Sequence, residues 1–293
     1  MLDGLVFVGM LASAAPADPL ARPPESHKAP VAYAARAPRS RYSLSIPLDP
    51  PTPRLPLPNI VGPAGRPLVV IDAGHGGHDP GAIGPQTGVR EKDVTLAMAK
   101  AIRDELLKGG RVRVAMTRAD DRFLILQERT EVARALRADL FISVHADAGP
   151  VGEASGATIY TLSEVASDSR AAQLAARENK ADIINGVNLS GAGADVSSIL
   201  IDLAQRETMT ASARFADLLK REGTGITFRP DHHRMAGFAV LKAPDIPAIL
   251  LEVGYITNPD DVARLASDAG RTAIATGISR AVAIHFARKL SGQ

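Results

Sequence analysis

After residue 67, apolar residues follow two patterns along the chain: short continuous runs, and longer stretches with helical spacing. Continuous runs of this length are typical of buried strands, and they predict strands at 68–72, 112–117, 139–144, 156–162, 239–241 and 248–253. Apolar residues that recur every three or four positions predict helices at 91–108, 125–137, 167–184, 196–222 and 271–289. Strands that alternate with helices predict an α/β fold, in which helices cover both faces of a mixed, mostly parallel sheet.

The first 66 residues follow neither pattern. Residues 5–15 resemble the apolar part of a signal peptide, but Asp3 is the only charge before them, where a signal peptide is positive. They are interpreted as a poor signal peptide, a misplaced start or the end of an upstream domain. Residues 16–67 hold most of the chain's proline, which predicts an extended, disordered linker. We therefore expect a signal remnant and linker at 1–66, and a folded domain at 67–293 with a helical insertion at about 163–210.

Composition narrows the class of protein. Hydrophobic residues make up 45% of the 293 residues, enough for a large core, whereas aromatic residues make up only 4% and Trp is absent. Residues 1–66 contain 7 Lys and Arg against 4 Asp and Glu, and the remaining residues contain 27 against 28. Without a basic excess or a stacking surface, the folded part is not expected to bind nucleic acid. The lack of cysteine excludes thiol catalysis, cysteine zinc sites and disulfides, and no apolar stretch predicts a membrane span.

Two histidines and two glutamates follow the predicted strands or open a helix. His75 follows the run at 69–73 and is flanked by glycines, His145 follows 140–144, and Glu252 follows 248–251. Glu91 opens the helix after the glycine-rich loop. Because ligands of α/β sheets bind beyond the carboxyl ends of strands, we expect these side chains to gather at one edge. Imidazoles and carboxylates in this combination indicate a hydrolytic zinc centre.

Two roles, binding the zinc ion and accepting the proton of its water, can be divided among these four residues. A catalytic zinc ion usually takes three protein ligands and keeps one position for water, and we assign the three to His75, Glu91 and His145. Glu252 follows four apolar residues, where burial of a carboxylate without a function would be unfavourable. We therefore expect Glu252 to accept the proton of the water.

Other readings of these residues stay open. Glu91 is also what the dipole of a helix favours in a first turn, and Glu252 could pair with a buried arginine. His78 competes with His75 for the same role and is ranked second. No ligand role is assigned to the other histidines. His232 and His233 are expected in a polar turn that faces substrate or solvent. His27 lies in the predicted linker, and His285 is expected to be structural.

Four motifs carry a resemblance to a known family. They are the sequence from Asp72 to Gly77, Glu91, the sequence from Ser143 to Ala146, and the sequence from Leu251 to Asn258. In this order they resemble the zinc-dependent N-acetylmuramoyl-L-alanine amidases of the cell-division type over about 67–290. The resemblance implies a three-layer fold like that of zinc exopeptidases, one zinc ion on His75, Glu91 and His145, and Glu252 as the catalytic glutamate. It also implies a periplasmic enzyme that cleaves peptidoglycan between N-acetylmuramic acid and L-alanine and separates daughter cells.

The segment 163–207 resembles the regulatory insertion of that family. In those relatives a helix lies across the active site and a glutamate from it caps the zinc ion. The sequence at 176–180 resembles that helix, so Glu178 is the candidate cap and Glu207 the second choice, the alternative being that Glu178 is an ordinary solvated helix residue. A fourth protein ligand would occupy the position that water needs.

The resemblance also implies a partner. In the family, a LytM-type activator protein displaces the capping helix. Four apolar residues at helical spacing could face either the core or such a partner, with the core preferred for most of them: Ile199, Leu200, Leu203 and Phe215. Relatives often carry a wall-targeting domain before the catalytic domain, and here only the linker precedes it, so targeting is an open question. We expect a monomer that acts on peptidoglycan.

Two other functions are compatible with the same residues. A zinc carboxypeptidase of similar fold would need an arginine to hold the terminal carboxylate of its substrate, and Arg229 or Arg234 could serve. A wall-binding module without catalysis would have no need for Glu252.

Overall fold

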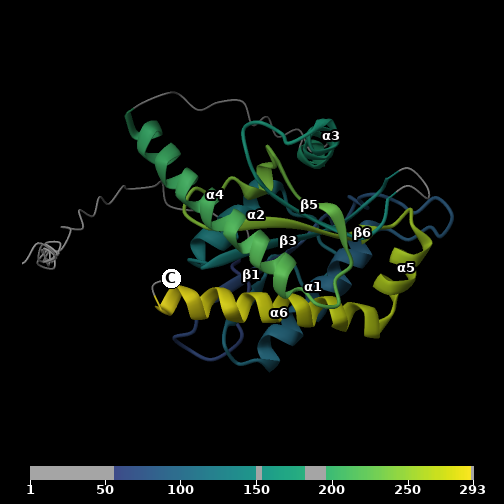
Figure 1. Ribbon diagram of the computed structural model, residues 1–293, viewed down its shortest axis with the longest axis horizontal. Coiled ribbons are helices and arrows are strands. Elements are labelled where there is room, and N and C mark those ends of the chain that lie inside the picture. Colours follow the sequence, from purple (N-terminus) through teal and green to yellow (C-terminus); the bar gives the residue numbers. More distant parts are fainter. Residues whose placement is uncertain (1–55, 150–153, 182–195, 292–293) are drawn as a thin grey trace, which may run out of the picture. The chain divides into compact units, whose positions relative to one another are not determined.

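A mixed sheet of six strands organises the part of the chain that the computed structural model describes, residues 56–149, 154–181 and 196–291 (Figure 1). The strands lie in the order β2-β1-β3-β6-β4-β5. Their bounds are Leu68–Ala73 for β1, Arg113–Met116 for β2, Leu140–Asp147 for β3, Ala157–Leu162 for β4, Phe228–Ala236 for β5 and Ala248–Tyr255 for β6. Only β4 and β6 pair antiparallel within this described sheet, and the other pairs are parallel.

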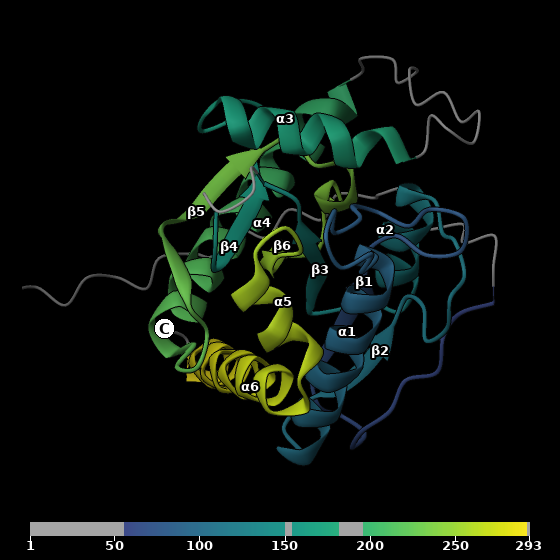
Figure 2. The same ribbon diagram turned by 90° about the vertical axis from the view of Figure 1, so that its right-hand side faces the viewer.

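Helices cover both faces of this sheet, as Figure 2 shows. One face packs against α1 (Glu91–Lys108), α4 (Val196–Glu222), α5 (Pro259–Ala266) and α6 (Asp268–Ser291). The other packs against α2 (Leu126–Ala135), α3 (Ser169–Glu178) and the short 3-10 helix η3 (Ala239–Leu241). A second 3-10 helix, η1 (Asn179–Ala181), continues α3. The predicted α/β fold with a mostly parallel sheet between two helical layers is therefore confirmed.

The alternation of side chains along the strands determines which face of the sheet holds the candidate site residues. In β3, Ile142 and Val144 join the core beneath α1 and α6, whereas Phe141 joins the core beneath α2 and α3. Successive side chains of a strand point to opposite faces, so Ser143 and His145 lie on the same face as Phe141. The polar positions Ser143 and His145 of β3 thus lie on the face that α3 covers.

Three sequence predictions were wrong in detail. The segment 239–241 is a 3-10 helix, because Val240 and Leu241 are buried beneath α2 without strand pairing. His232 and His233 lie in β5 and not in a turn. Since β5 is an edge strand with several exposed residues and a proline, it has no apolar run to reveal it. Helix α5 was also missed, although its N-cap Asn258 accepts hydrogen bonds from the amides of Asp260 and Asp261.

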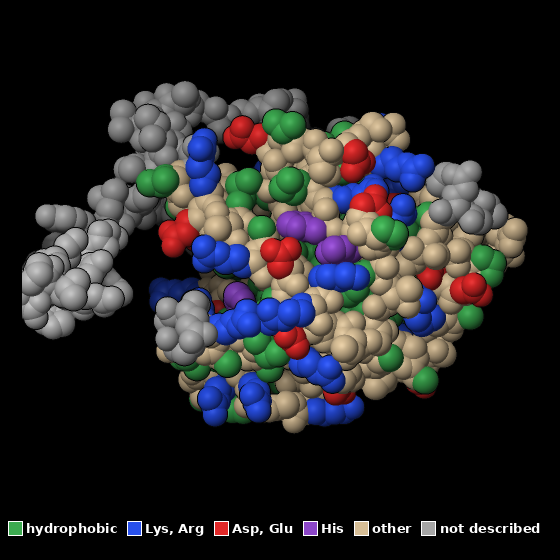
Figure 3. Space-filling view, in the orientation of Figure 1, with side chains coloured by type: hydrophobic (Ala, Val, Ile, Leu, Met, Phe, Trp, Pro, Cys, Tyr) green, Lys and Arg blue, Asp and Glu red, His purple; other side chains and the backbone are tan. Residues whose placement is uncertain are grey.

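The last residues of the predicted linker contact the sheet. Val61 exchanges two backbone hydrogen bonds with Val114 of β2, of 2.9 and 2.8 Å. Residues 1–55 of the signal remnant and linker that the sequence predicts at 1–66 lie outside the described residues. None of the described helices has the length and apolar character needed to cross a bilayer. On the face drawn in Figure 3, Lys and Arg are mixed with Asp and Glu.

Candidate metal centre

The loop after β1 turns the chain so that His75 points back over the sheet. His75 has a φ of 60°, in the left-handed region that few residues other than glycine adopt, and Gly76 and Gly77 follow with φ of 125° and 59°. Its Nδ1 atom lies 2.9 Å from Asp79 Oδ2, which fixes the ring. A hydrogen bond of this kind leaves the other nitrogen, Nε2, for a ligand.

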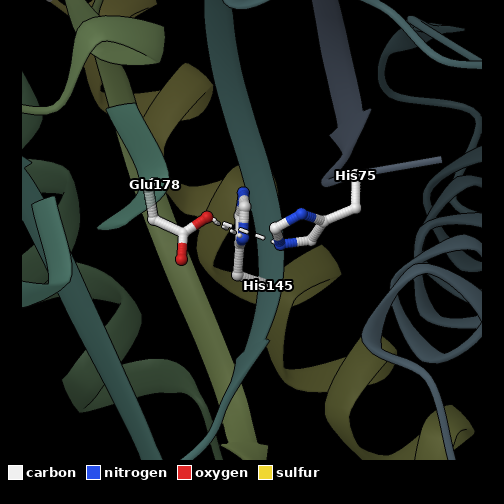
Figure 4. A group of neighbouring side chains, drawn as sticks. All are labelled: His75, His145 and Glu178. Carbon is white, nitrogen blue, oxygen red and sulfur yellow. Dashed lines mark ion pairs between the residues drawn. The ribbon is translucent and has the colours of Figure 1, made fainter. Parts of the chain in front are cut away.

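His75, His145 and Glu178 form a compact group of possible metal ligands. Glu178 Oε2 lies 3.4 Å from His75 Nε2 and 3.3 Å from His145 Nδ1. One ligand atom from each of the three side chains lies within 4.8 Å of the others, and all three residues are buried. Figure 4 shows the carboxylate of Glu178 facing both rings, which come from β3 and from the loop after β1.

Glu91 approaches the same two nitrogens. Its Oε1 atom lies 3.1 Å from His75 Nε2 and 3.1 Å from His145 Nδ1. The carboxylate is held in place by the backbone amides of Ala146, which donates to Oε1, and Ala82, which donates to Oε2, over 3.0 and 2.9 Å. Glu91 is only 1% exposed, so its position is fixed before any ligand binds.

These four donors fit a zinc ion. Their imidazole–carboxylate separations are 3.1, 3.1, 3.3 and 3.4 Å. Four ligands at tetrahedral zinc distances would lie about 3.3 Å apart. His75 Nε2 is buried without a hydrogen-bond partner among the described residues. A buried polar atom of this kind calls for a partner, which a metal ion would supply.

The electrostatics of the site favour a cation. Burial opposes a charge on His75, but Glu91, Asp79 and Glu178 together raise the pKa of this imidazole well above its usual value. Burial alone would raise the pKa of Glu91, yet His75 and His145 hold it well below its usual value. The carboxylates therefore stabilise positive charge between them, from a proton or from a metal ion.

Glu252 lies beside His145 in the sheet. The two residues are in register between β3 and β6, and they lie inside these strands, not at the strand ends that the apolar runs predicted. Glu252 is 0% exposed, and both of its carboxylate oxygens lack a hydrogen-bond partner among the described residues. Burial raises the pKa of Glu252 well above its ordinary value, and Asp147, Glu91 and Glu178 raise it further. A carboxylate in this state is a good proton acceptor.

The structure brings together the five residues of the predicted site, His75, Glu91, His145, Glu178 and Glu252. Glu178 is 5% exposed, so it is not the ordinary solvated helix residue of the alternative reading. Glu207, the second choice for the cap, is exposed on α4 and lines a groove with residues that include Arg214 and His285.

The other histidines lie apart from this group. The ring of His78 packs against Phe123 at 4.3 Å between centroids, and that of His285 packs against Phe215 at 5.2 Å. His233 pairs with Thr161 Oγ1 over 3.0 Å, and His232 is half-buried beside it on the edge strand. Phe215 is a core residue and Leu203 is exposed, while the side chains of Ile199 and Leu200 lie outside the described residues.

Several polar residues around the site were missed from the sequence. Arg177 Nη2 lies 2.5 Å from Asp147 Oδ1 at the end of β3. The buried Arg118 and Arg129 lie below the loop that carries His75. The available signal was Asp72, a charged residue that ends an apolar run and therefore requires buried partners.

Comparison with known proteins defines the class. The family profile described as N-acetylmuramoyl-L-alanine amidase matches residues 69–283, and the chain belongs to this family. It is 38% identical over 224 residues to the N-acetylmuramoyl-L-alanine amidase AmiA of Escherichia coli strain K12, covering 76% of this chain and 77% of that protein. It is 39% identical over 241 residues to AmiC of Escherichia coli O6:H1 strain CFT073, covering 81% of this chain and 57% of that protein.

A solved structure agrees with this assignment. The catalytic domain of CwlV, an N-acetylmuramoyl-L-alanine amidase from Bacillus (Paenibacillus) polymyxa var. colistinus, superposes with a TM-score of 0.53 at 27% identity. The match covers 75% of this chain and 98% of that domain, so the described fold corresponds to a catalytic domain of the family.

Proposed function

We propose that this protein is a zinc-dependent peptidoglycan hydrolase that cleaves the amide bond between the lactyl group of N-acetylmuramic acid and L-alanine. The observation that carries the proposal is the buried group of two imidazoles and two carboxylates, with the unpartnered Glu252 beside it. Family membership supports the choice of substrate. The relatives' names refer to the same reaction.

The proposed roles follow from the contacts. His75, Glu91 and His145 would hold the ion, with Asp79 orienting His75 through Nδ1. A bound zinc ion would lower the pKa of its water to about 7 and polarise the scissile carbonyl group. Glu252 would accept the proton of the attacking water and pass it to the nitrogen of the leaving L-alanine. This role requires free carboxylate oxygens in a dry environment, which matches the burial of Glu252.

We also propose that α3 inhibits the resting enzyme and holds it at a low basal activity. Glu178 occupies the fourth side of the site, which the attacking water needs. The helix is fastened at its C-terminal end, because the side chain of Asn179 donates to Gly237 O over 2.9 Å and accepts from the amide of Ala239 over 2.8 Å. Full activity then requires a partner that displaces the helix, and the resemblance points to a LytM-type activator in the periplasm during daughter-cell separation.

The test of the catalytic role is product analysis with zinc-loaded protein. Purified protein should release entire stem peptides from peptidoglycan, and Glu252→Gln should lower the release rate at least about 1,000-fold while one zinc ion stays bound. Glu222→Gln, on the far helical layer, is the matched control and should retain activity. Wild-type turnover by Glu252→Gln would refute the mechanism.

Product analysis would also distinguish the amidase from a carboxypeptidase. That enzyme would release only terminal residues. Both candidate arginines are already engaged: Arg229 donates to Tyr255 Oη over 2.7 Å, and Arg234 pairs with Asp231 and Asp168. Neither is free to hold a substrate carboxylate, which favours the amidase.

A further inference from the structure

Two guanidinium groups are buried beneath the loop that presents His75. Arg118 is 1% exposed and Arg129 is 2% exposed. They come from different parts of the chain, since Arg118 follows β2 and Arg129 lies in α2. Arg129 pairs with the buried carboxylate of Asp72, and both guanidinium groups donate to a row of backbone carbonyl groups.

The carbonyl groups belong to three consecutive residues of the loop. Ala73 O accepts from Arg118 Nε over 2.8 Å and from Arg129 Nη1 over 2.7 Å. Gly74 O accepts from Arg118 Nη2 over 2.7 Å. His75 O accepts from Arg129 Nη2 over 2.8 Å. Each peptide plane between the end of β1 and the first candidate ligand is thus held by an arginine.

His75 needs this support because its own backbone conformation is unfavourable. A β-carbon disfavours a φ of 60°, and such residues persist only where the surroundings impose the conformation. Arg129 is placed to impose it, because the same guanidinium group that holds His75 O is anchored by Asp72 Oδ1 over 2.9 Å. Asp72 is in turn fixed by the hydroxyl groups of Thr117 and Ser143, over 2.6 and 2.7 Å.

We propose that Arg129 is a positioning residue for the metal, which acts through the carbonyl group of His75. This inference rests on the proposed zinc role of His75. Arg129 holds the peptide plane after the Cα atom of His75, which directs Nε2 toward Glu91 and His145 and Nδ1 toward Asp79. A purely structural role would be served as well by apolar residues, since buried ion pairs contribute little net stability. The N–H groups of Arg129 donate to the carbonyl groups of Ala73, His75 and Leu124. This arrangement fixes the conformation of the loop that carries His75.

The test replaces the guanidinium group of Arg129, whose donors reach two carbonyl groups at once, and measures zinc binding. Arg129→Lys keeps a positive charge beside Asp72 but cannot reach Ala73 O and His75 O together. We expect its zinc affinity, measured by competition with a chromophoric chelator, to fall 10- to 100-fold. The visible absorption spectrum of the cobalt-substituted protein should also change, because it reports ligand geometry. At saturating zinc, kcat should fall while KM stays within about twofold.

Ser212→Ala is the matched control. It removes a buried hydrogen bond of 2.9 Å to the amide of Ala248, far along the chain from the loop, and it should lower the melting temperature without changing zinc affinity or the cobalt spectrum. If Arg129→Lys does not fold, Arg129→Gln replaces it, because Asp72 keeps Thr117 and Ser143 as partners. The same outcomes are expected of it.

The outcomes separate this inference from the proposed function. If the wild-type protein binds no zinc, the proposed function fails. If the wild-type protein binds one zinc ion and the Arg129 variant matches it in affinity and cobalt spectrum, the proposed function stands and the positioning role is refuted.

Discussion

Gly74 lies between β1 and His75, and its lack of a side chain determines how closely His145 can approach. A β-carbon built at Gly74 would lie 2.5 Å from His145 Cε1 and 2.6 Å from His145 Nε2. These distances are far below van der Waals contact. The backbone of the loop therefore passes directly beside the imidazole ring, and the glycine is a requirement of the site as well as of the turn.

Replacing Gly74 with alanine should displace the ring of His145. We expect Gly74→Ala to lower zinc affinity at least about tenfold and to reduce turnover in proportion, because the displaced ring no longer faces Glu91. Isothermal titration with zinc measures the first effect. Gly109→Ala is the control, since the nearest atom to its new β-carbon would be Leu106 O at 3.4 Å and its φ is −68°. Equal zinc affinity of the two variants would contradict the argument.

At the residue scale, the sequence could locate candidate site residues where the chain itself marks the position. An imidazole or carboxylate directly after an apolar run must lie near the end of a buried strand, which identified His75, His145 and Glu252. The runs could not show that β3 and β6 continue to Asp147 and Tyr255, because the polar residues beyond them remain paired in the sheet. Arg129 was missed because a helix position does not reveal a contact with a loop 54 residues away in sequence.

At the scale of elements, α3 is a helix with one buried side and a buried carboxylate at its end. Ala171, Leu174 and Ala175 pack on the sheet, and Glu178 extends the same side into the metal site. Asp168 begins the helix by accepting the amide of Ala171 over 2.9 Å. Because α3 buries mainly small side chains, it contributes little apolar area, and a partner could displace it at modest cost.

Removing the carboxylate of α3 should release the site. We expect Glu178→Ala to raise the basal rate of stem-peptide release at least about tenfold, because the fourth side of the metal site becomes available to water. Arg177→Ala should have a smaller effect in the same direction, since it removes the contacts of the guanidinium group with Asp147 and with Glu178 Oε1 but leaves the carboxylate of Glu178 in place. Arg170→Ala, exposed on the same helix, should leave the rate unchanged. A Glu178→Ala protein that binds zinc without any gain in rate would contradict the capping role.

The elements differ in how far sequence could predict them. Helix α1 has the bounds that its apolar spacing predicted, and the central strands β1, β3 and β6 begin within one residue of their predicted starts, because these segments are deeply buried. In edge strand β5, apolar and polar residues do not alternate regularly, and the strand contains Pro230. The local sequence therefore does not distinguish it from a loop. The position of α3 across the site was expected only through resemblance, since the packing of a helix on a sheet depends on contacts that no local pattern encodes.

At the scale of the whole molecule, a buried polar layer joins β1 and β3 of the sheet to α2 and to the loop that carries His75. Asp72 of β1 binds Arg129 of α2, Thr117 beyond β2 and Ser143 of β3, so one carboxylate links four segments. Burial alone would raise the pKa of Asp72, but Arg129 and the two hydroxyl groups more than offset it, and the net pKa is lowered. The folded protein therefore depends on Asp72 being ionised.

This dependence predicts how stability varies with pH. An unfolded aspartate has a pKa of about 3.9, and the folded pKa of Asp72 lies lower. Its contribution to the free energy of unfolding is therefore fully present above about pH 5 and is lost as the pH falls through the folded pKa. Asp72→Asn should cost about 3 kcal/mol at pH 7, because it leaves the charge of Arg129 unpaired.

The measurement is urea unfolding of metal-free protein between pH 7 and pH 3. The wild-type protein should lose more stability over this range than Asp72→Asn, so the difference between them narrows as the pH falls. His75 titrates in both proteins and largely cancels in the comparison. The exposed Asp104→Asn should follow the wild-type curve. A constant difference at every pH would mean that Asp72 has the same pKa in the folded and unfolded chain, and that the buried layer is held by shape and not by its charge.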